Sequence, residues 1–257
     1  MGRSCLDCRC GKKKKRITNK NAFVSEFLVG SIMNNIIFTE INGKPIEGYL
    51  GDNDNAEILF ILKEPNTPDV KSDDGFWFKQ VIFDKNRSNS GKRYFNIFGC
   101  LAEKILNYNE SKFDLLKRCA YINLYPFSGS ERISNHYKEV LTAFKNTSLD
   151  CRKDINIDKS STPIEIAENR MSLINQMIVS GKTKYIVTVK DIYDKLSGGD
   201  YSNSYFQLEY GRKNQTKSFA FHILSNDVKL CEFWHPSYTW INYHFLEKAT
   251  CNDLSSK

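Results

Sequence analysis

The sequence predicts an α/β domain, built as a three-layer αβα sandwich around a central, mostly parallel four-stranded sheet. Four short apolar runs have the length and composition of strands, over residues 58–62, 119–125, 184–189 and 228–233. Helical patterns separate these runs, and strands that alternate with helices favour parallel pairing. The first run, Ile-Leu-Phe-Ile-Leu, is apolar throughout and stops at Glu64-Pro65, which is typical of a strand buried on both faces.

The elements before residue 94 are expected to be a helix, a hairpin, the first strand and a loop. Residues 21–37 carry apolar side chains at helical spacing and predict an amphipathic helix. Residues 36–51 alternate around Asn42-Gly43, a dipeptide that favours a β-hairpin turn. The first strand is predicted over 56–63, and the polar residues 66–93 that follow it predict a long loop.

Helices and strands are predicted to alternate from residue 94 onward. Pro126 ends the second strand, and Gly198-Gly199 end a short helix. In chain order the patterns predict a helix over 94–108, the strand 119–125, a helix followed by a mobile loop within 131–161, a helix over 163–180, the strand 184–189, the short helix 191–196, a hairpin within 200–216 and the strand 228–233.

The first 20 residues predict a basic arm that precedes a single domain over residues 21–250. The arm holds Lys12–Arg16 and the thiols of Cys5, Cys8 and Cys10, spaced C-x-x-C-x-C. Three thiolates are one short of a closed tetrahedral zinc site, and the chain has no second C-x-x-C. A flexible arm with incidental thiols is the favoured interpretation, with metal binding as the alternative. We therefore predict no bound metal.

Composition places this chain among folded proteins that can bind nucleic acid. Its 257 residues are 40% hydrophobic and 13% aromatic, and its formal net charge is +7. It has no apolar run of the roughly 20 residues that span a bilayer and no signal-peptide pattern, and Leu6 stands where a myristoylation signal needs Ser or Thr. We expect a cytoplasmic monomer whose eight cysteines are mostly reduced, without a membrane partner.

Polar side chains follow each predicted strand. In open parallel sheets, ligands bind outside the carboxyl ends of the strands. The segments at those ends are Lys63-Glu64-Pro65-Asn66, Asn123-Leu124-Tyr125, Lys190-Asp191 and His235-Pro236-Ser237. A carboxylate, an amide and an imidazole are therefore expected to converge on one cleft.

These segments resemble the uracil-DNA glycosylase superfamily. In order, the chain has a strand ending E-P, a loop with G-K-R-Y-F before a helix, a strand ending Y-I-N and a strand ending W-H-P-S-Y. The resemblance runs from about residue 48 to residue 242. The spacing is most similar to the thermophile-type branch, with its G-E-x-P-G, G-R-P-F and H-P-A/S loops. The resemblance implies a uracil-DNA glycosylase-like fold and cleavage of the N-glycosidic bond of a deaminated or damaged base, most simply uracil, in DNA.

The resemblance implies catalytic roles for Glu64 and His235. Base excision passes through a cationic sugar and a departing base anion, which a carboxylate and a donor can stabilise. Glu64 would position the water, and His235 would hydrogen-bond the base oxygen. Asn123 falls where the family places the amide that reads the base. The alternative roles are structural. Glu64 would cap a turn, His235 would be a partly buried imidazole held by its neighbours, and Asn123 would hydrogen-bond loop backbone.

The resemblance also implies contacts with the extruded nucleotide and with DNA. Tyr94 aligns with the stacking phenylalanine of the family, and Phe95 is its neighbour; packing under the following helix is the alternative. The remaining base-binding positions are Pro65, Asn66, Pro236 and Ser237, and the DNA-binding positions are Lys63, Tyr238 and Trp240, of which Trp240 is a candidate minor-groove wedge.

Departures from the family pattern leave two other functions open. Leu62 and Asn66 replace loop glycines, and Lys63 replaces the usual Glu or Gln. The later ligand positions of the branch's iron–sulfur cluster fall near Phe127 and the 167–170 region, so no cofactor is expected. A bulkier loop favours a non-catalytic module that binds nucleic acid or a base. A nucleoside or nucleotide hydrolase on a similar sheet is the second alternative.

Overall fold

The structure, a computed structural model, describes a large part of the chain from residue 40 to residue 234. The described residues are 40–41, 44–45, 47–49, 56–64, 89–106, 108–127, 134–153, 155–201, 204–210 and 215–234. Contacts divide the chain into two units, Met1–Asn34 and Asn35–Lys257, and all described residues belong to the second. The predicted arm, its three cysteines and the helix predicted over 21–37 lie outside the described residues.

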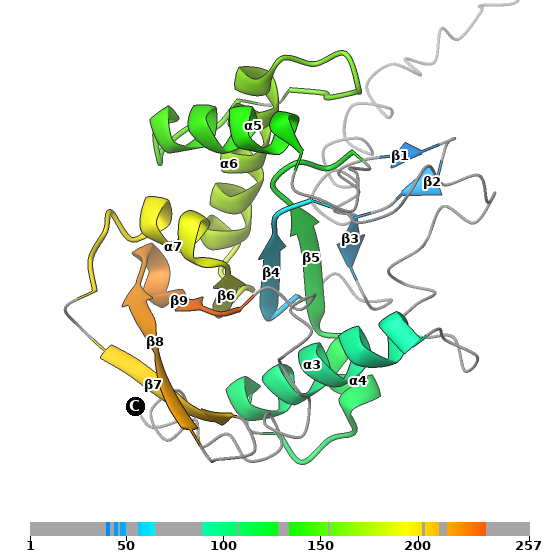
Figure 1. Cartoon of the computed structure of the whole chain (residues 1–257), viewed down its shortest axis with the longest axis vertical. Coiled ribbons are helices and arrows are strands. Elements are labelled where there is room, and N and C mark those ends of the chain that lie inside the picture. The colour runs from blue at the N-terminus through cyan, green and yellow to red at the C-terminus, as the bar shows by residue number, and fades with distance from the viewer. Residues whose placement is uncertain are drawn as a thin grey trace, which may run out of the picture. The chain divides into compact units, whose positions relative to one another are not determined.

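A seven-stranded mixed sheet forms the centre of the second unit, so the α/β class is confirmed (Figure 1). Its strands lie in the order β3-β5-β4-β6-β9-β8-β7. The four strands β5, β4, β6 and β9 pair in parallel, while β3 adds to β5 and β8 adds to β9 in antiparallel fashion. The bounds are β3 Gly48–Tyr49, β4 Ile58–Leu62, β5 Cys119–Asn123, β6 Tyr185–Thr188, β7 Ser204–Tyr210, β8 Gln215–Ile223 and β9 Lys229–Glu232.

The prediction of a four-stranded sheet was wrong in strand number. The sequence predicts a hairpin within 200–216, but only β7 lies in that range: it pairs with β8, from Ser204↔Phe221 to Tyr210↔Gln215, and β8 lies mostly beyond residue 216. β8 runs on to Ile223 and joins β9, so the hairpin extends the main sheet. β3 has only two residues, too few to show a strand pattern. The first hairpin is confirmed, because β1 (Glu40–Ile41) pairs with β2 (Lys44–Pro45) on either side of residues 42–43.

Helices cover both faces of the parallel strands. Side chains alternate between the faces of β4, so Ile58, Phe60 and Leu62 pack with α3 and α4, while Leu59 and Ile61 pack with α5, α6 and α7. Figure 1 shows the same division of the helices. The bounds are α3 Asn89–Leu106, α4 Lys112–Leu116, α5 Asn135–Asn146, α6 Pro163–Val179 and α7 Lys190–Leu196, with a 3₁₀ turn at Ser225–Asp227.

Helix boundaries follow local capping chemistry, and two departures from the sequence prediction have simple causes. α3 begins at Asn89 instead of Tyr94, because its first five residues are polar and carry no apolar stripe to reveal the helix. α4 was not predicted, since five residues are too few for a helical period. Thr162 and Glu165 form a capping box at the start of α6. No helix in the described ranges has both the length and the apolarity needed to cross a bilayer.

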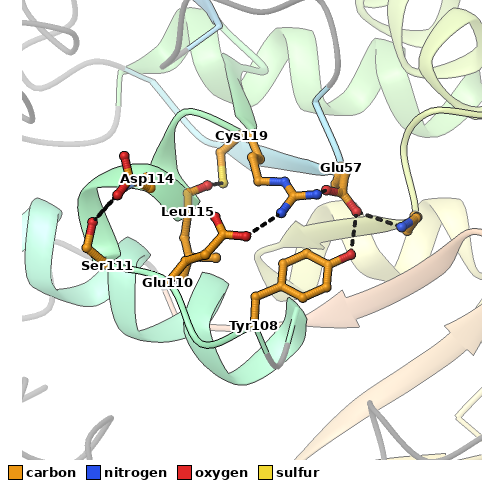
Figure 2. Close-up of polar contacts among 9 residues, drawn as sticks. Glu57, Tyr108, Glu110, Ser111, Asp114, Leu115 and Cys119 are labelled. Carbon is orange, nitrogen blue, oxygen red and sulfur yellow. Dashed lines mark hydrogen bonds and ion pairs between the residues drawn. The ribbon is translucent and has the colours of Figure 1, made fainter.

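The amino ends of the parallel strands are joined by the carboxylate of Glu57 (Figure 2). Glu57 is 7% exposed and precedes β4. It forms ion pairs with Arg118, which precedes β5, and with Lys184, which precedes β6 and lies 2.7 Å away. The hydroxyl of Tyr108 donates to the same carboxylate over 3.3 Å, and the Arg118 guanidinium lies 4.3 Å from the centroid of the Tyr108 ring. This arrangement ties three neighbouring strands together at one end of the sheet.

Candidate functional site

The candidate site lies at the carboxyl ends of β5, β4, β6 and β9, the end opposite Glu57. The chain goes from β4 to β5 on one side and later to β6 on the other, so its direction across the sheet reverses at β4. Crevices at such reversals are the usual ligand sites of open α/β sheets. Parallel pairing continues past Leu62 and Asn123, because the N–H groups of Leu124 and Tyr125 donate to the carbonyls of Leu62 and Lys63 over 2.8 and 2.9 Å.

Glu64 contacts the first turn of α5. Its side chain is nearly buried, with the residue 4% exposed, and its carboxylate accepts hydrogen bonds from the backbone N–H (2.7 Å) and the hydroxyl (2.6 Å) of Ser134. The Ser134 hydroxyl in turn accepts from the N–H of Tyr137 and caps α5. The negative charge of Glu64 therefore sits at the positive end of a 12-residue helix. This contact gives Glu64 a structural role, and the catalytic role stays a prediction.

An aromatic pair lies at the start of α5. Tyr125 stacks on the exposed imidazole of His136, with the ring centroids 5.9 Å apart and the planes inclined by 22°. Burial raises the pKa of Tyr125, and the charge of Glu64 raises it further. Tyr125 packs against the core on the side of the sheet that α5 covers.

Asn123 ends β5 and is 1% exposed. Its backbone N–H donates to the carboxylate of Glu47, and its side-chain Nδ2 donates to the hydroxyl of Tyr121 over 2.6 Å. Among the described residues, no group donates a hydrogen bond to Asn123 Oδ1. A buried polar atom without a partner costs about 1–3 kcal/mol, so folding alone does not account for this amide.

Tyr94 packs against the core cluster that contains Tyr121, the hydrogen-bond partner of the Asn123 amide. Tyr121 and Asn123 are two residues apart on one strand and therefore share a face of the sheet, the face covered by α3. Burial raises the pKa of Tyr121, and the charge of Glu47 raises it further, while the hydrogen bond from Asn123 lowers it. The Tyr94 ring lies 5.8 Å from that of Phe98, and both Tyr94 and Phe95 are partly buried against the core. Tyr94 thus packs on the α3 face of the sheet, the face that carries the Asn123 side chain, and its stacking role stays a prediction.

The predicted carboxylate and amide point to different neighbours. The strand ends that carry them are adjacent, since Leu62 pairs with Asn123. Glu64 turns to α5, while the Asn123 side chain lies on the face of α3. Within the part of the chain that the structure describes, no hydrogen bond joins the two side chains.

Lys63, which was predicted to contact DNA, follows β4 and contacts residues of α7 and α5. Its ammonium lies 3.7 Å from the carboxylate of Asp191 at the start of α7 and 6.0 Å from the centroid of the Tyr137 ring. The side chain is 17% exposed. Lys190, the residue before Asp191, donates to the hydroxyl of Tyr201 over 2.7 Å. The positive charge at this edge is therefore held in place by local partners.

The remaining predicted site residues lie outside the described residues. They are Pro65, Asn66, His235, Pro236, Ser237, Tyr238 and Trp240. The parallel pairing of β9 with β6 continues to Phe233, whose N–H donates to the carbonyl of Thr188 over 2.7 Å. The Trp234 ring packs edge-on against Phe219, with the centroids 4.7 Å apart.

Two charged residues of this region were not identified from the sequence. Arg170 of α6 and Glu47, which precedes β3, form an ion pair of 2.6 Å, and both side chains are 0% exposed. One signal was available: Arg170 falls on the apolar stripe of α6, between Ala167 and Ile174. A charge on a buried stripe requires a buried partner. No pattern pointed to Glu47 as that partner, since it lies 123 residues away in the sequence.

Among the described residues, no three His, Cys, Asp or Glu side chains are grouped so that they could hold a metal ion. Comparison of the chain with family models, with curated proteins and with solved structures finds no match.

Proposed function

We propose that this chain is a DNA glycosylase-like protein that recognises an extruded base through Asn123. The observation that carries the proposal is the buried Oδ1 of Asn123, an acceptor to which no described group donates. Its position at the carboxyl end of a parallel strand is where α/β sheets bind ligands. The resemblance of the strand-end segments to the uracil-DNA glycosylase superfamily supplies the substrate class.

The hydrogen-bonding state of the amide favours bases that present an N–H group. Nδ2 has two N–H groups and donates one of them to Tyr121, and Oδ1 accepts from no described group, so Oδ1 is the acceptor that the amide offers to a ligand N–H. Uracil offers its N3–H on the Watson–Crick edge, which an extruded base exposes. Tyr94, which packs on the same face of the sheet, would contribute an aromatic surface for the base.

In the catalytic form of the proposal, Glu64 positions the attacking water and His235 stabilises the departing base. A second candidate function is a base-binding module of the same fold that does not hydrolyse the bond. The two hydrogen bonds from Ser134 to Glu64 favour this candidate, because they commit both carboxylate oxygens to the cap of α5. A nucleoside hydrolase is the third possibility, and it differs in requiring no DNA.

One assay separates these functions. DNA carrying a single uracil, single- or double-stranded, is incubated with the protein, and both the abasic product and the bound fraction are measured beside free deoxyuridine. Glu64→Gln removes the charge while keeping an acceptor for the Ser134 N–H. The matched control is Glu165→Gln, since Glu165 accepts from the N–H (2.7 Å) and hydroxyl (2.8 Å) of Thr162 in the same way, at the start of α6.

If the protein is a glycosylase, we expect an abasic product that is lost in the Glu64→Gln variant and retained in the Glu165→Gln variant. Binding without product in the wild-type protein supports the module. Cleavage confined to deoxyuridine supports the hydrolase. If the wild-type protein neither binds nor cleaves any of these substrates, the proposed function is wrong.

A further inference from the structure

We propose that the buried pair of Glu47 and Arg170 is a positioning device that holds the Asn123 amide ready for its ligand. This inference rests on the proposed function of Asn123. It assigns a role in recognition to two residues that lie on other elements and do not themselves need to touch the base.

Glu47 reaches Asn123 because it directly precedes the edge strand β3, which begins beside the end of β5. β3 pairs antiparallel with β5 through Gly48↔Tyr121, so the residue before Gly48 lies opposite the end of β5. Gly48 has φ 131°, a backbone conformation that other residues rarely adopt, and it is buried. At this bend the Glu47 carboxylate accepts the backbone N–H of Asn123, 76 residues along the chain.

Arg170 fixes the other oxygen of the same carboxylate. Its Nη1 donates to Glu47 Oε2 over 2.6 Å, so one carboxylate joins helix α6 to the end of β5. Both side chains are 0% exposed. Within the described residues, Asn123 is therefore held by Glu47 at its backbone N–H and by Tyr121 at Nδ2, and these contacts orient its unpaired atom, Oδ1.

The energetics of buried ion pairs argue against stability as the reason for this one. Removing two charges from water offsets most of their attraction, and well-packed apolar replacements are often neutral or stabilising. A pair of this kind is best understood through what its geometry specifies. Here it specifies the place of an amide that carries a buried acceptor.

The test uses a double variant that deletes the pair and keeps its volume, Glu47→Leu with Arg170→Met, in the full chain. Because both charges are removed together, the variant is expected to fold. The probe is a single-stranded oligonucleotide with one uracil, and its dissociation constant is measured by fluorescence anisotropy. The double variant is expected to bind about tenfold more weakly, the effect of misplacing one hydrogen bond.

A matched control comes from the opposite end of the same strands. Glu57, like Glu47, is a buried carboxylate, and its cationic partners are Arg118 and Lys184. Glu57→Gln is expected to lower stability and to leave the affinity for the oligonucleotide unchanged. The Glu47–Arg170 pair is proposed to act through Asn123. In a protein that already carries Asn123→Leu, removing the Glu47–Arg170 pair should therefore not lower the affinity further. Equal losses from the Glu57 control and the Glu47/Arg170 variant, or fully additive losses with Asn123→Leu, would overturn the proposal.

An independent readout covers the case in which the wild-type protein binds no uracil-containing strand. That result contradicts the proposed function, and the positioning role is then judged from the side-chain amide signals of Asn123 in a ¹⁵N NMR spectrum. Shifted or broadened signals in Glu47→Gln, with unchanged signals in Glu57→Gln, support positioning. Unchanged signals in both variants rule it out.

Discussion

Asn123 combines two properties that stability alone does not explain. It is 1% exposed, and its Oδ1 accepts no hydrogen bond from the described residues. Folded proteins satisfy nearly all their buried polar atoms, so an exception calls for a physical reason. Recognition of a ligand N–H is such a reason, because the energy lost on folding is recovered on binding.

The isosteric substitution Asn123→Leu separates the two roles of this residue. The variant loses the bond to Tyr121 but also removes the buried acceptor, so we expect the free energy of unfolding to change by less than about 1 kcal/mol. The affinity for a uracil-containing strand should fall at least about tenfold. Urea unfolding and anisotropy titrations measure the two quantities, with Asn156→Leu on an exposed loop as the control. A large loss of stability with unchanged affinity would show a structural amide.

At the scale of single elements, Glu64 stabilises the start of α5 by accepting hydrogen bonds from its N-cap residue, Ser134. Glu64→Ala removes two hydrogen bonds to Ser134 and the negative charge at the helix start, so the unfolding free energy should fall by about 1–2 kcal/mol. Glu165→Ala removes a similar cap from α6 at an exposed site and should cost less. Thermal unfolding of both variants checks the order. An equal or larger loss from Glu165→Ala would contradict this account of Glu64.

Glu57 joins three strand starts, and its removal should weaken the sheet as a unit. We expect Glu57→Ala to lower the unfolding free energy by about 2–3 kcal/mol, somewhat less than for a fully buried pair because Lys184 is 56% exposed. Lys184→Met should have a much smaller effect, since Arg118 and Tyr108 continue to contact the carboxylate. Denaturant titrations of the two variants measure this difference. Equal effects would show that the three strand starts do not depend on Glu57.

At the scale of the whole molecule, buried thiol and phenol groups are expected to lower the stability of the fold at alkaline pH. Burial raises the pKa of the Cys119 thiol above its ordinary 9.0 and that of Tyr121 above 10.0. Above about pH 9 the unfolded chain releases protons that the folded chain retains, so stability falls as pH rises. The thermal midpoint should therefore decline between about pH 8 and pH 10.5. Cys119→Ala should delay the onset, and a pH-independent midpoint would contradict this sign.

Much of the parallel core could be predicted from the sequence because its information is local. The continuous apolar run of β4 indicates burial on both faces, and the capping residues before α6 mark the start of that helix. The short elements β3 and α4 could not be predicted, since neither is long enough to show a period.

The candidate site was only partly accessible to the same reasoning. Residues at the ends of strands could be named because parallel strands share a carboxyl edge, and the structure describes Asn123 and Tyr94 on the same face of the sheet. The direction of the Glu64 side chain and the partnership of Glu47 with Arg170 depend on contacts between residues far apart in the chain. Such contacts have no local sequence signature.

The most direct test of the central claim is a comparison of uracil with N3-methyluracil, each placed once in the same single-stranded oligonucleotide. The claim is that Asn123 Oδ1 accepts the base N–H, and the methyl group removes that donor. The wild-type protein is expected to bind the uracil strand at least about tenfold more tightly, and Asn123→Leu to bind both strands equally. Equal affinity of the wild-type protein for the two strands, or undiminished discrimination by Asn123→Leu, would contradict the claim.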